Sequence, residues 1–275
     1  MFLKSIMFAL LFTICSIFIN INWINDIACY WGYFLAIYLV TFIAIIPGFI
    51  FLFNFISLLL NKKEKKQCTR KDEDVTILIP VYNAKESIKE TLVSIKNQKY
   101  CGNIYINIID DGSTDETLEV LQSMDLDSNT TIIEMPHRGK ANALNKGLEK
   151  VNTEYTITID SDTILHPLAV KNIMNKLTNS DKKTVATAGC LFVKNAKKSF
   201  ITKLQEWDYT LGILGVKFVQ GNYNSILVAQ GAFSAYKTKA IKEIGGWENC
   251  VGEDIVLTWQ LLSKGYETNF AKNAI

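Results

Sequence analysis

The sequence predicts an α/β protein: a mostly parallel β-sheet domain preceded by two transmembrane helices. Two observations predict this class. β-rich apolar runs alternate with helical stretches from about residue 74 onward, and two long uncharged apolar runs precede residue 61. Strands that alternate with helices form parallel sheets covered by those helices. Of the 275 residues 49% are hydrophobic and the net charge is +2, which excludes a disordered chain and gives no reason to expect nucleic-acid binding.

The N-terminal part is predicted to be a membrane hairpin. Residues 5–21 and 30–60 carry no charged side chain, and about 20 apolar residues cross a bilayer. The longer run has Pro47-Gly48 in its middle, where we expect a kink. A signal peptide is the alternative for the first run, although no A-x-A-like cleavage site follows it. We expect a short loop at about residues 22–29 to join the two spans.

Basic residues set the predicted orientation of this hairpin. Residues 61–71 carry six positive charges and one negative charge, whereas the loop at 22–29 has no Lys or Arg. The positive-inside rule keeps such a basic segment in the cytoplasm, and the same segment suits anionic lipid headgroups. The sequence therefore predicts a multi-pass plasma-membrane protein with a hairpin at 1–60, a basic linker at 61–73 and a cytoplasmic domain at 74–275.

The elements of the domain follow from their apolar patterns. VTILIPVY, IYINIID and YTITID are rich in β-branched residues and end at turn residues, as buried strands do. The stretch 199–218 has the pattern of an amphipathic, interfacial helix. In chain order we expect strands at 75–82, 104–110, 131–135 and 155–160, each followed by a helix, at 84–97, 114–123, 140–150 and 167–178; then strands at 184–193 and 226–236, helices at 199–218 and 253–264, and a last strand within ETNFAKNAI.

The first acidic cluster, Asp110-Asp111-Gly112, follows the second strand. Ligands of parallel sheets bind beyond the carboxyl ends of the strands, where a carboxylate can accept hydrogen bonds from a base or a ribose. The next residues, Ser113-x-x-Glu116, have the pattern of a capping box. A helix cap accounts for Ser113 and Glu116, and it leaves Asp110 and Asp111 as candidates for ligand binding.

The second acidic cluster is Asp160-Ser161-Asp162, directly after YTITI. Residues i and i+2 of an extended segment point the same way, so both carboxylates can face a divalent cation completed by substrate phosphates. A solvated turn after a strand is the alternative.

The six cysteines form no C-x-x-C pair and the chain has only two histidines, which argues against a zinc site. Scattered cysteines of this kind are typical of a protein in a reduced compartment.

Two further clusters stand at predicted helix starts. Glu253-Asp254 can supply a general base that reaches an acceptor hydroxyl, or it can be an ordinary acidic first turn favoured by the helix dipole. Arg138-Gly139-Lys140 can offer backbone N–H groups and an ammonium to a phosphate, or it can be a solvated basic loop.

The order and spacing of these motifs are more specific than any one of them. The series IPVYNA, DDGSTD, HRGKANALNKG, DSD, VAQGAFSAY and GGWENCVGED resembles the family-two glycosyltransferases of GT-A fold. It is most similar to the membrane-bound branch that contains poly-N-acetylglucosamine, cellulose, chitin and hyaluronan synthases. The resemblance covers about residues 75–271, and a preceding membrane hairpin fits the same branch.

The resemblance implies roles for the matching positions. Residues near the nucleotide-sugar donor would be Tyr82 beside the uracil, Asp111 bonded to it, Lys140 on the nucleotide, and Asp160, which with Asp162 would hold the diphosphate through Mg²⁺ or Mn²⁺. Gln230, Gly231 and Ala232 would border the acceptor sugar. Asp254 would be the catalytic base, with Glu253 beside it. The implied reaction is an inverting transfer from a UDP-sugar to a glycan or lipid-linked acceptor, and the likeness around 226–237 and GED favours UDP-N-acetylglucosamine.

The chain departs from the family at one place. Processive members carry a Q-x-x-R-W motif after the catalytic acid, and no such motif follows Asp254 here. This predicts that the C-terminal part of the domain is missing, or that a partner subunit supplies it. Two alternatives therefore stay open: a catalytically incompetent, membrane-tethered nucleotide-sugar binder, and a transferase that adds one sugar to a lipid-linked acceptor.

Overall fold

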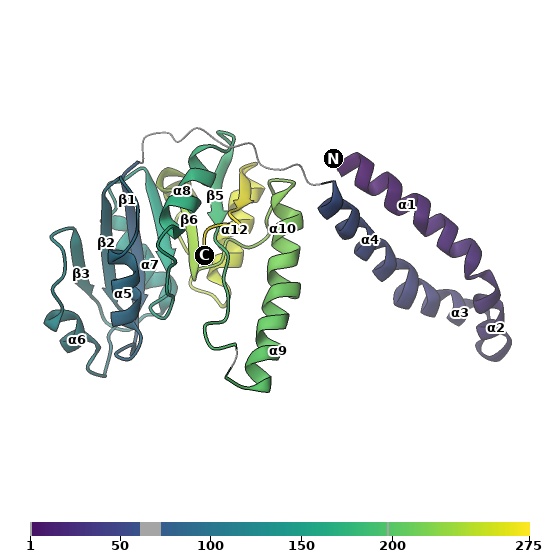
Figure 1. The fold of residues 1–275 in the computed structure, drawn as a ribbon, viewed down its shortest axis with the longest axis horizontal. Helices are drawn as coiled ribbons and strands as arrows, with labels where there is room; N and C mark the ends of the chain where they lie inside the picture. Colours follow the sequence, from purple (N-terminus) through teal and green to yellow (C-terminus); the bar gives the residue numbers. More distant parts are fainter. Residues whose placement is uncertain (1, 61–72, 197) are drawn as a thin grey trace. The chain divides into compact units, whose positions relative to one another are not determined.

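A computed structural model describes residues 2–60, 73–196 and 198–275 of the chain. These residues form two compact units, an N-terminal helical unit and a C-terminal α/β unit, which we describe separately (Figure 1). The predicted basic linker at 61–73 lies almost wholly outside the described residues.

The N-terminal unit is a pair of long helical stretches that pack against each other. Helix α1 (Phe2–Ile19) runs beside α4 (Ile46–Leu59), and the rings of Phe2 and Phe53 meet edge to face at 5.9 Å. Two stretches are long and apolar enough to cross a membrane, Phe2–Ile19 and Tyr33–Leu59. Their length and composition agree with the predicted pair of spans.

The segment that joins the two spans differs from the prediction. The expected loop at 22–29 is helix α2 (Ile21–Trp31), separated from α3 (Tyr33–Val40) by Gly32 at φ 78°. A helix forms because INWINDIACYW contains no proline or glycine, and the break falls at the first glycine. The expected irregularity near Pro47 lies one turn earlier, in the π-helical segment η1 (Thr41–Ile45), because proline crowds the carbonyl four residues before it.

The C-terminal unit contains a seven-stranded sheet in the order β3-β2-β1-β4-β6-β5-β7. Strand β6 alone runs antiparallel to its neighbours β4 and β5, so the predicted mostly parallel sheet is confirmed. The first four strands begin and end within one residue of their predicted bounds. The strands are β1 (Val75–Val81), β2 (Ile104–Asp110), β3 (Thr130–Glu134), β4 (Tyr155–Ile159), β5 (Thr184–Ala188), β6 (Phe233–Lys237) and β7 (Glu267–Phe270).

Helices cover both faces of this sheet, which explains why the strands are continuously apolar. Alternate residues of β1 point to opposite faces: Ile77 and Ile79 pack into one core and Leu78 into the other. The first core is completed by α5 (Ile88–Lys96), α6 (Thr117–Ser123) and α8 (Ala169–Thr178). The second is completed by α7 (Lys140–Glu149), α11 (Thr238–Ile244) and α12 (Glu253–Ser263).

Two predicted strands are shorter than expected, and this creates the irregular segments that border the site. Residues 189–193 and 226–232, which the sequence predicts to belong to the strands at 184–193 and 226–236, are not strands. At Gly189 the chain closes directly onto the ring of Phe233, where a side chain at position 189 would collide with it, and pairing ends there.

The predicted helix at 199–218 is present as three consecutive segments, α9 (Phe200–Asp208), η2 (Tyr209–Gly215) and α10 (Val216–Gly221), which Figure 1 shows as one continuous helix. Its exposed apolar side chains include Phe200, Leu204 and Trp207. That surface agrees with the interfacial helix expected here, and contact with a lipid surface stays a prediction.

Candidate active site

One edge of the sheet gathers most of the predicted site residues. Strands β1, β2 and β4 end at this edge, and β6 begins there because it runs antiparallel. The segment before β6 therefore lies beside the end of β4, and Asp160 N–H donates to Ala232 O at 3.3 Å. A cavity of about 350 Å³ opens at the edge, lined by Pro80, Val81, Tyr82, Asp111, His137, Gly139, Lys140, Asp160, Ser161 and Asp162.

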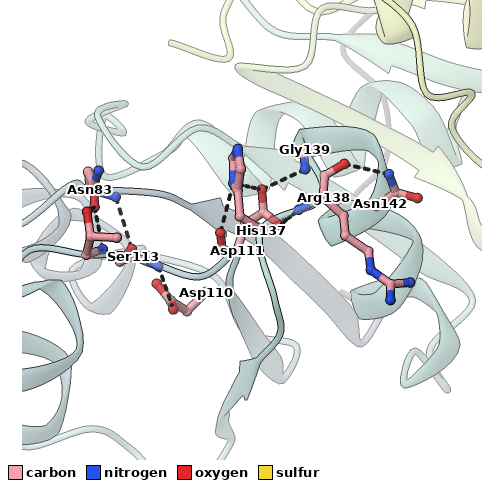
Figure 2. A network of polar contacts seen from close by, with 9 residues as sticks. Asn83, Asp110, Asp111, Ser113, His137, Arg138, Gly139 and Asn142 are labelled. Carbon is pink, nitrogen blue, oxygen red and sulfur yellow. Dashed lines mark hydrogen bonds and ion pairs between the residues drawn. The ribbon is translucent and has the colours of Figure 1, made fainter.

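Asp111 joins the end of β2 to the loop that precedes α7 (Figure 2). Its two carboxylate oxygens accept the backbone N–H groups of Arg138 and Gly139, each at 2.8 Å. His137 Nδ1 lies 2.9 Å from Asp111 Oδ2 and 3.0 Å from Asp111 O, so this nitrogen carries the hydrogen. Oδ2 thus accepts two hydrogen bonds, whereas Oδ1 accepts one and keeps a second lone pair. Through Oδ1 the side chain can bind a ligand while it holds this loop.

Asp110 has a different environment from its neighbour. Its side chain is buried and does not line the cavity; one oxygen accepts Ser113 N–H at 3.1 Å, while the other has no partner among the described residues. Of the two predicted acids, only Asp111 reaches the cavity.

The predicted capping box at Ser113 and Glu116 is wrong. Ser113 Oγ accepts Asn83 N–H at 3.0 Å, and Glu116 makes no cap bond to α6. Asp115 accepts Thr117 N–H at 3.0 Å instead. Side-chain oxygens of the segment after each of β1 and β2 accept backbone N–H groups of the other segment. This tertiary contact makes α5 and α6 begin three to four residues later than predicted.

An aromatic pair stands at the cavity. The rings of Tyr82 and His137 stack with centroids 4.2 Å apart and an interplanar angle of 26°, and Tyr82 is 45% exposed. His137 was not among the predicted site residues. The HRGK sequence was noted for its basic residues, and no pattern in it marks the histidine as the partner of Tyr82.

Lys140 begins α7, and its side chain pairs with Asp160 and Glu253 and lies close to Gly231. Its ammonium lies 2.5 Å from Asp160 Oδ1 and 3.5 Å from Glu253 Oε1. Burial opposes the charge of this group, but the facing carboxylates outweigh burial and raise the pKa of Lys140 above its ordinary value. A Cβ at Gly231 would lie 2.9 Å from Lys140 Nζ, so glycine at 231 leaves room for the lysine.

Asp160 and Asp162 offer a donor set that fits a hard divalent cation. Both line the cavity, and Asp162 is exposed with no hydrogen bond or ion pair in the described parts of the chain. Mg²⁺ is commonly held by one or two carboxylates together with substrate phosphates, and two carboxylates are present. No group of three or more His, Cys, Asp or Glu side chains that could hold a metal occurs among the described residues, so the remaining ligands would have to come from substrate and water.

Asp254 sits in the first turn of α12 and contacts Gly231. Its Oδ2 accepts Gly231 N–H at 3.0 Å and its Oδ1 accepts Ile255 N–H at 2.8 Å. These bonds fix the carboxylate at the helix N-terminus, where the dipole favours negative charge.

The neighbouring Gln230 bonds to Gly189 O at 3.0 Å and to the ammonium of Lys217. Among the acceptor-side predictions, Gln230 and Gly231 therefore adjoin Asp254, whereas Ala232 adjoins Asp160.

Lys217 on α10 is a second residue that sequence reasoning missed. It is 6% exposed, and burial lowers its pKa to about 8 despite the opposite charge of Asp254. The available signal was a single charge within the apolar run LGILGVKFV.

Comparison with known proteins assigns the fold to a class and the chain to a family. The fold is that of GT-A glycosyltransferases. A mannosyltransferase from Pyrobaculum calidifontis, in complex with GDP-Man and Mn²⁺, superimposes with a TM-score of 0.67 at 20% identity over 82% of this chain and 62% of its own. Residues 1–349 of S. aureus TarS, in complex with UDP-GlcNAc, give 0.53 at 16% identity over 73% of this chain and 56% of the other.

The chain belongs to glycosyltransferase family 2, whose model matches residues 76–245. Poly-beta-1,6-N-acetyl-D-glucosamine synthase of Staphylococcus epidermidis is 30% identical over 220 residues, which are 79% of this chain and 52% of the synthase. The chain thus spans about half the length of this curated relative. The family and fold expected from the motifs are confirmed.

Proposed function

We propose that the chain takes part in transfer of N-acetylglucosamine from UDP-N-acetylglucosamine to a hydroxyl group of a glycan or lipid-linked acceptor, with inversion at the anomeric carbon. The observation that carries the proposal is the sharing of one sheet edge by Asp111, Lys140, Asp160 and Asp162 around a cavity, with Asp254 fixed beside it. The name of the similar synthase and the UDP-GlcNAc complex of a protein with this fold support the donor.

The donor half of the proposal assigns the cavity to the nucleotide. The exposed face of Tyr82, stacked on His137, provides a flat surface for uracil. Asp111 Oδ1 has a free lone pair for a base N–H. Lys140 stands at the start of α7, where an ammonium and backbone N–H groups suit a phosphate.

A divalent cation, Mg²⁺ or Mn²⁺, would be held by Asp160 and Asp162 and would supply charge neutralisation for the leaving diphosphate. The Mn²⁺ in the complex of the P. calidifontis mannosyltransferase is consistent with this assignment. Lys140 now pairs with Asp160, and we infer that the lysine turns toward a donor phosphate when the nucleotide binds.

The acceptor half assigns the general base to Asp254. The two N–H groups that it accepts orient its carboxylate, and lone pairs remain on both oxygens to take a proton from an acceptor hydroxyl. Glu253 faces Lys140 and links the base to the donor side. Gln230 and Gly231 adjoin the same carboxylate and would border the acceptor sugar.

The N-terminal unit supports membrane association, and we propose that it crosses the plasma membrane twice and leaves the α/β unit in the cytoplasm. The two apolar stretches and the six positive charges at 61–71 support this arrangement.

Calorimetric binding of UDP and UDP-N-acetylglucosamine to the detergent-solubilised chain, with and without Mn²⁺, tests the donor site. We expect Mn²⁺-dependent binding that is lost in Asp162→Ala and kept in Asp125→Ala, an exposed acid outside the site. Absence of binding by the folded wild-type chain would contradict the proposal.

A further inference from the structure

Lys217 is buried without an ionic partner. The side chain comes from α10, and its ammonium donates a hydrogen bond to Gln230 Oε1, a neutral acceptor. No carboxylate forms an ion pair with it in the part of the chain that the structure describes. Gln230 in turn donates to Gly189 O at 3.0 Å, and the backbone of the next residue, Gly231, donates to Asp254 at 3.0 Å. A chain of bonds thus connects Gly189 and Lys217 to the segment that holds the proposed base.

This arrangement is unfavourable for the fold. A buried ammonium loses hydration, and one neutral hydrogen bond does not replace it. Burial is the main reason that the pKa of Lys217 falls to about 8 from its ordinary value of 10.5. An apolar residue of similar length would occupy the same place without that penalty. A costly buried charge beside a site is better explained by a role in the site than by a role in stability.

We propose that Lys217 is a positioning residue for the acceptor side: its ammonium fixes the side chain of Gln230, and through the segment 230–231 it sets the place of the acceptor sugar in front of Asp254. This rests on the proposed function, which places Gln230 and Gly231 at the acceptor. Lys217 does not line the donor cavity, so its effect falls on the acceptor alone.

The charge of Lys217 gives the proposal a pH signature. The groups that act on it electrostatically are Asp254 on α12 and Cys190 after β5, and Gln230 is neutral. Burial raises the pKa of the Cys190 thiol to about 11, so Cys190 is uncharged at pH 8. A hydrogen bond from an ammonium is stronger than one from a neutral amine. Acceptor affinity should therefore fall as the pH rises through about 8, where Lys217 loses its proton.

The test compares Lys217→Met, Lys217→Arg and Gln230→Ala in the 275-residue chain in detergent. Calorimetry measures two affinities: that for UDP with Mn²⁺, and that for a β-1,6-linked N-acetylglucosamine oligosaccharide with UDP and Mn²⁺ already bound. We expect Lys217→Met to leave the UDP affinity within about twofold and to weaken oligosaccharide binding at least tenfold. The double variant of Lys217→Met and Gln230→Ala should bind the oligosaccharide no more weakly than the weaker-binding single variant, because both substitutions remove the same contact.

Controls separate this role from a structural one. Lys239→Met, an exposed lysine on α11, should change neither affinity. Lys217→Arg keeps its charge above pH 8 and should lose the alkaline fall in oligosaccharide affinity that the wild type shows. The proposal would be overturned if Lys217→Met lowered the melting temperature and weakened UDP binding and oligosaccharide binding equally. It would also be overturned if Lys217→Met bound the oligosaccharide as tightly as the wild type does, or if the UDP-bound wild type did not bind the oligosaccharide at all. Failure of the wild type to bind UDP would instead overturn the proposed function.

Discussion

Single residues at the junction of β2 and α7 carry much of the proposed donor site. Asp111 serves both the fold and the proposed ligand, because its carboxylate holds two backbone N–H groups and the ring of His137. From their place after a strand, sequence reasoning made both Asp110 and Asp111 candidates for ligand binding, and the structure brings only Asp111 to the cavity. The loop that it holds was not predictable, because the bond joins residues 27 and 28 positions apart.

Replacing Asp111 by Asn should loosen the loop at 137–139. The amide presents an NH₂ group where the carboxylate accepted a backbone N–H, and an unsatisfied buried donor costs about 1–3 kcal/mol. We expect the melting temperature to fall and UDP affinity to drop at least tenfold in calorimetry. Asp125→Asn, at an exposed acid, is the matched control; equal behaviour of the two variants would contradict this account.

Gly112 shows a second residue-scale constraint. It has φ 72°, and a Cβ there would lie 2.7 Å from the backbone nitrogen of His137. Gly245, at the end of α11, has φ 90° but open space around it. Gly112→Ala therefore incurs both backbone strain and a collision, whereas Gly245→Ala incurs only the strain.

We expect Gly112→Ala to destabilise the chain by more than Gly245→Ala, which itself should cost about 1 kcal/mol. Denaturant unfolding of the two variants, followed by tryptophan fluorescence, measures the difference. Equal losses would show that the turn after β2 moves away from His137 without cost.

At the scale of elements, α12 and α10 both contact the segment that precedes β6. The first turn of α12 aims Asp254 at the segment before β6, and α10 delivers Lys217 to the same segment. Both contacts depend on β6 running antiparallel, because only then does the segment 230–232 lie at the edge where β4 ends.

Asp254→Asn should remove the proposed base and keep the hydrogen-bond acceptor for Gly231. Loss of a general base lowers transfer rates by about 10²–10⁴-fold, and UDP affinity should remain near the wild-type value. The measurement is release of UDP from UDP-N-acetylglucosamine in the presence of an oligosaccharide acceptor. Full activity in the variant would contradict the assignment of the base.

The buried lysine of α10 should also be visible in the pH dependence of stability. Its folded pKa of about 8 lies below the unfolded value of 10.5, so the unfolded chain binds more protons between these values and stability rises with pH across that window. The shift corresponds to about 3 kcal/mol. Unfolding of the wild type and Lys217→Met at pH 7 and pH 10 should show a gain with pH that the variant lacks. Equal pH dependence of the wild type and the variant would mean that burial does not lower the pKa of Lys217 in the folded chain.

At the scale of the whole molecule, the helical unit and the α/β unit have separate tasks. The proposed orientation places Cys29, in the segment between the two spans, outside the cell and Cys250, near the site, inside it. Both are free and exposed within the units described.

A membrane-impermeant maleimide tests this orientation in variants whose single cysteine is Cys29 or Cys250, the other five cysteines being replaced. We expect Cys29 to react in intact cells and Cys250 to react only after the membrane is opened. The inverse pattern would place the α/β unit outside. Extraction of the chain from membranes adds an independent check. Salt at 1 M screens electrostatic attachment through the basic segment, so a chain that spans the membrane twice should stay in the membrane in 1 M salt and be extracted only by detergent.

The sequence by itself determined the sheet class, the first four strands and the edge of the sheet at which the candidate site acids lie. Buried parallel strands are local apolar runs, and their carboxyl ends must share one edge, so Asp111, Asp160 and Asp162 could be placed together before any coordinates. The family was readable for the same reason, since its motifs are short segments at those ends.

Tertiary structure alone decided the contacts between distant segments. The partner of Tyr82, the links from Ser113 to Asn83, the late starts of α5 and α6, and the short β5 and β6 all depend on residues far apart in sequence. Lys217 is the clearest case, because a single charge in an apolar run does not by itself predict a role. Its place beside Gln230 arises only when α10 packs against the segment before β6 and buries the ammonium.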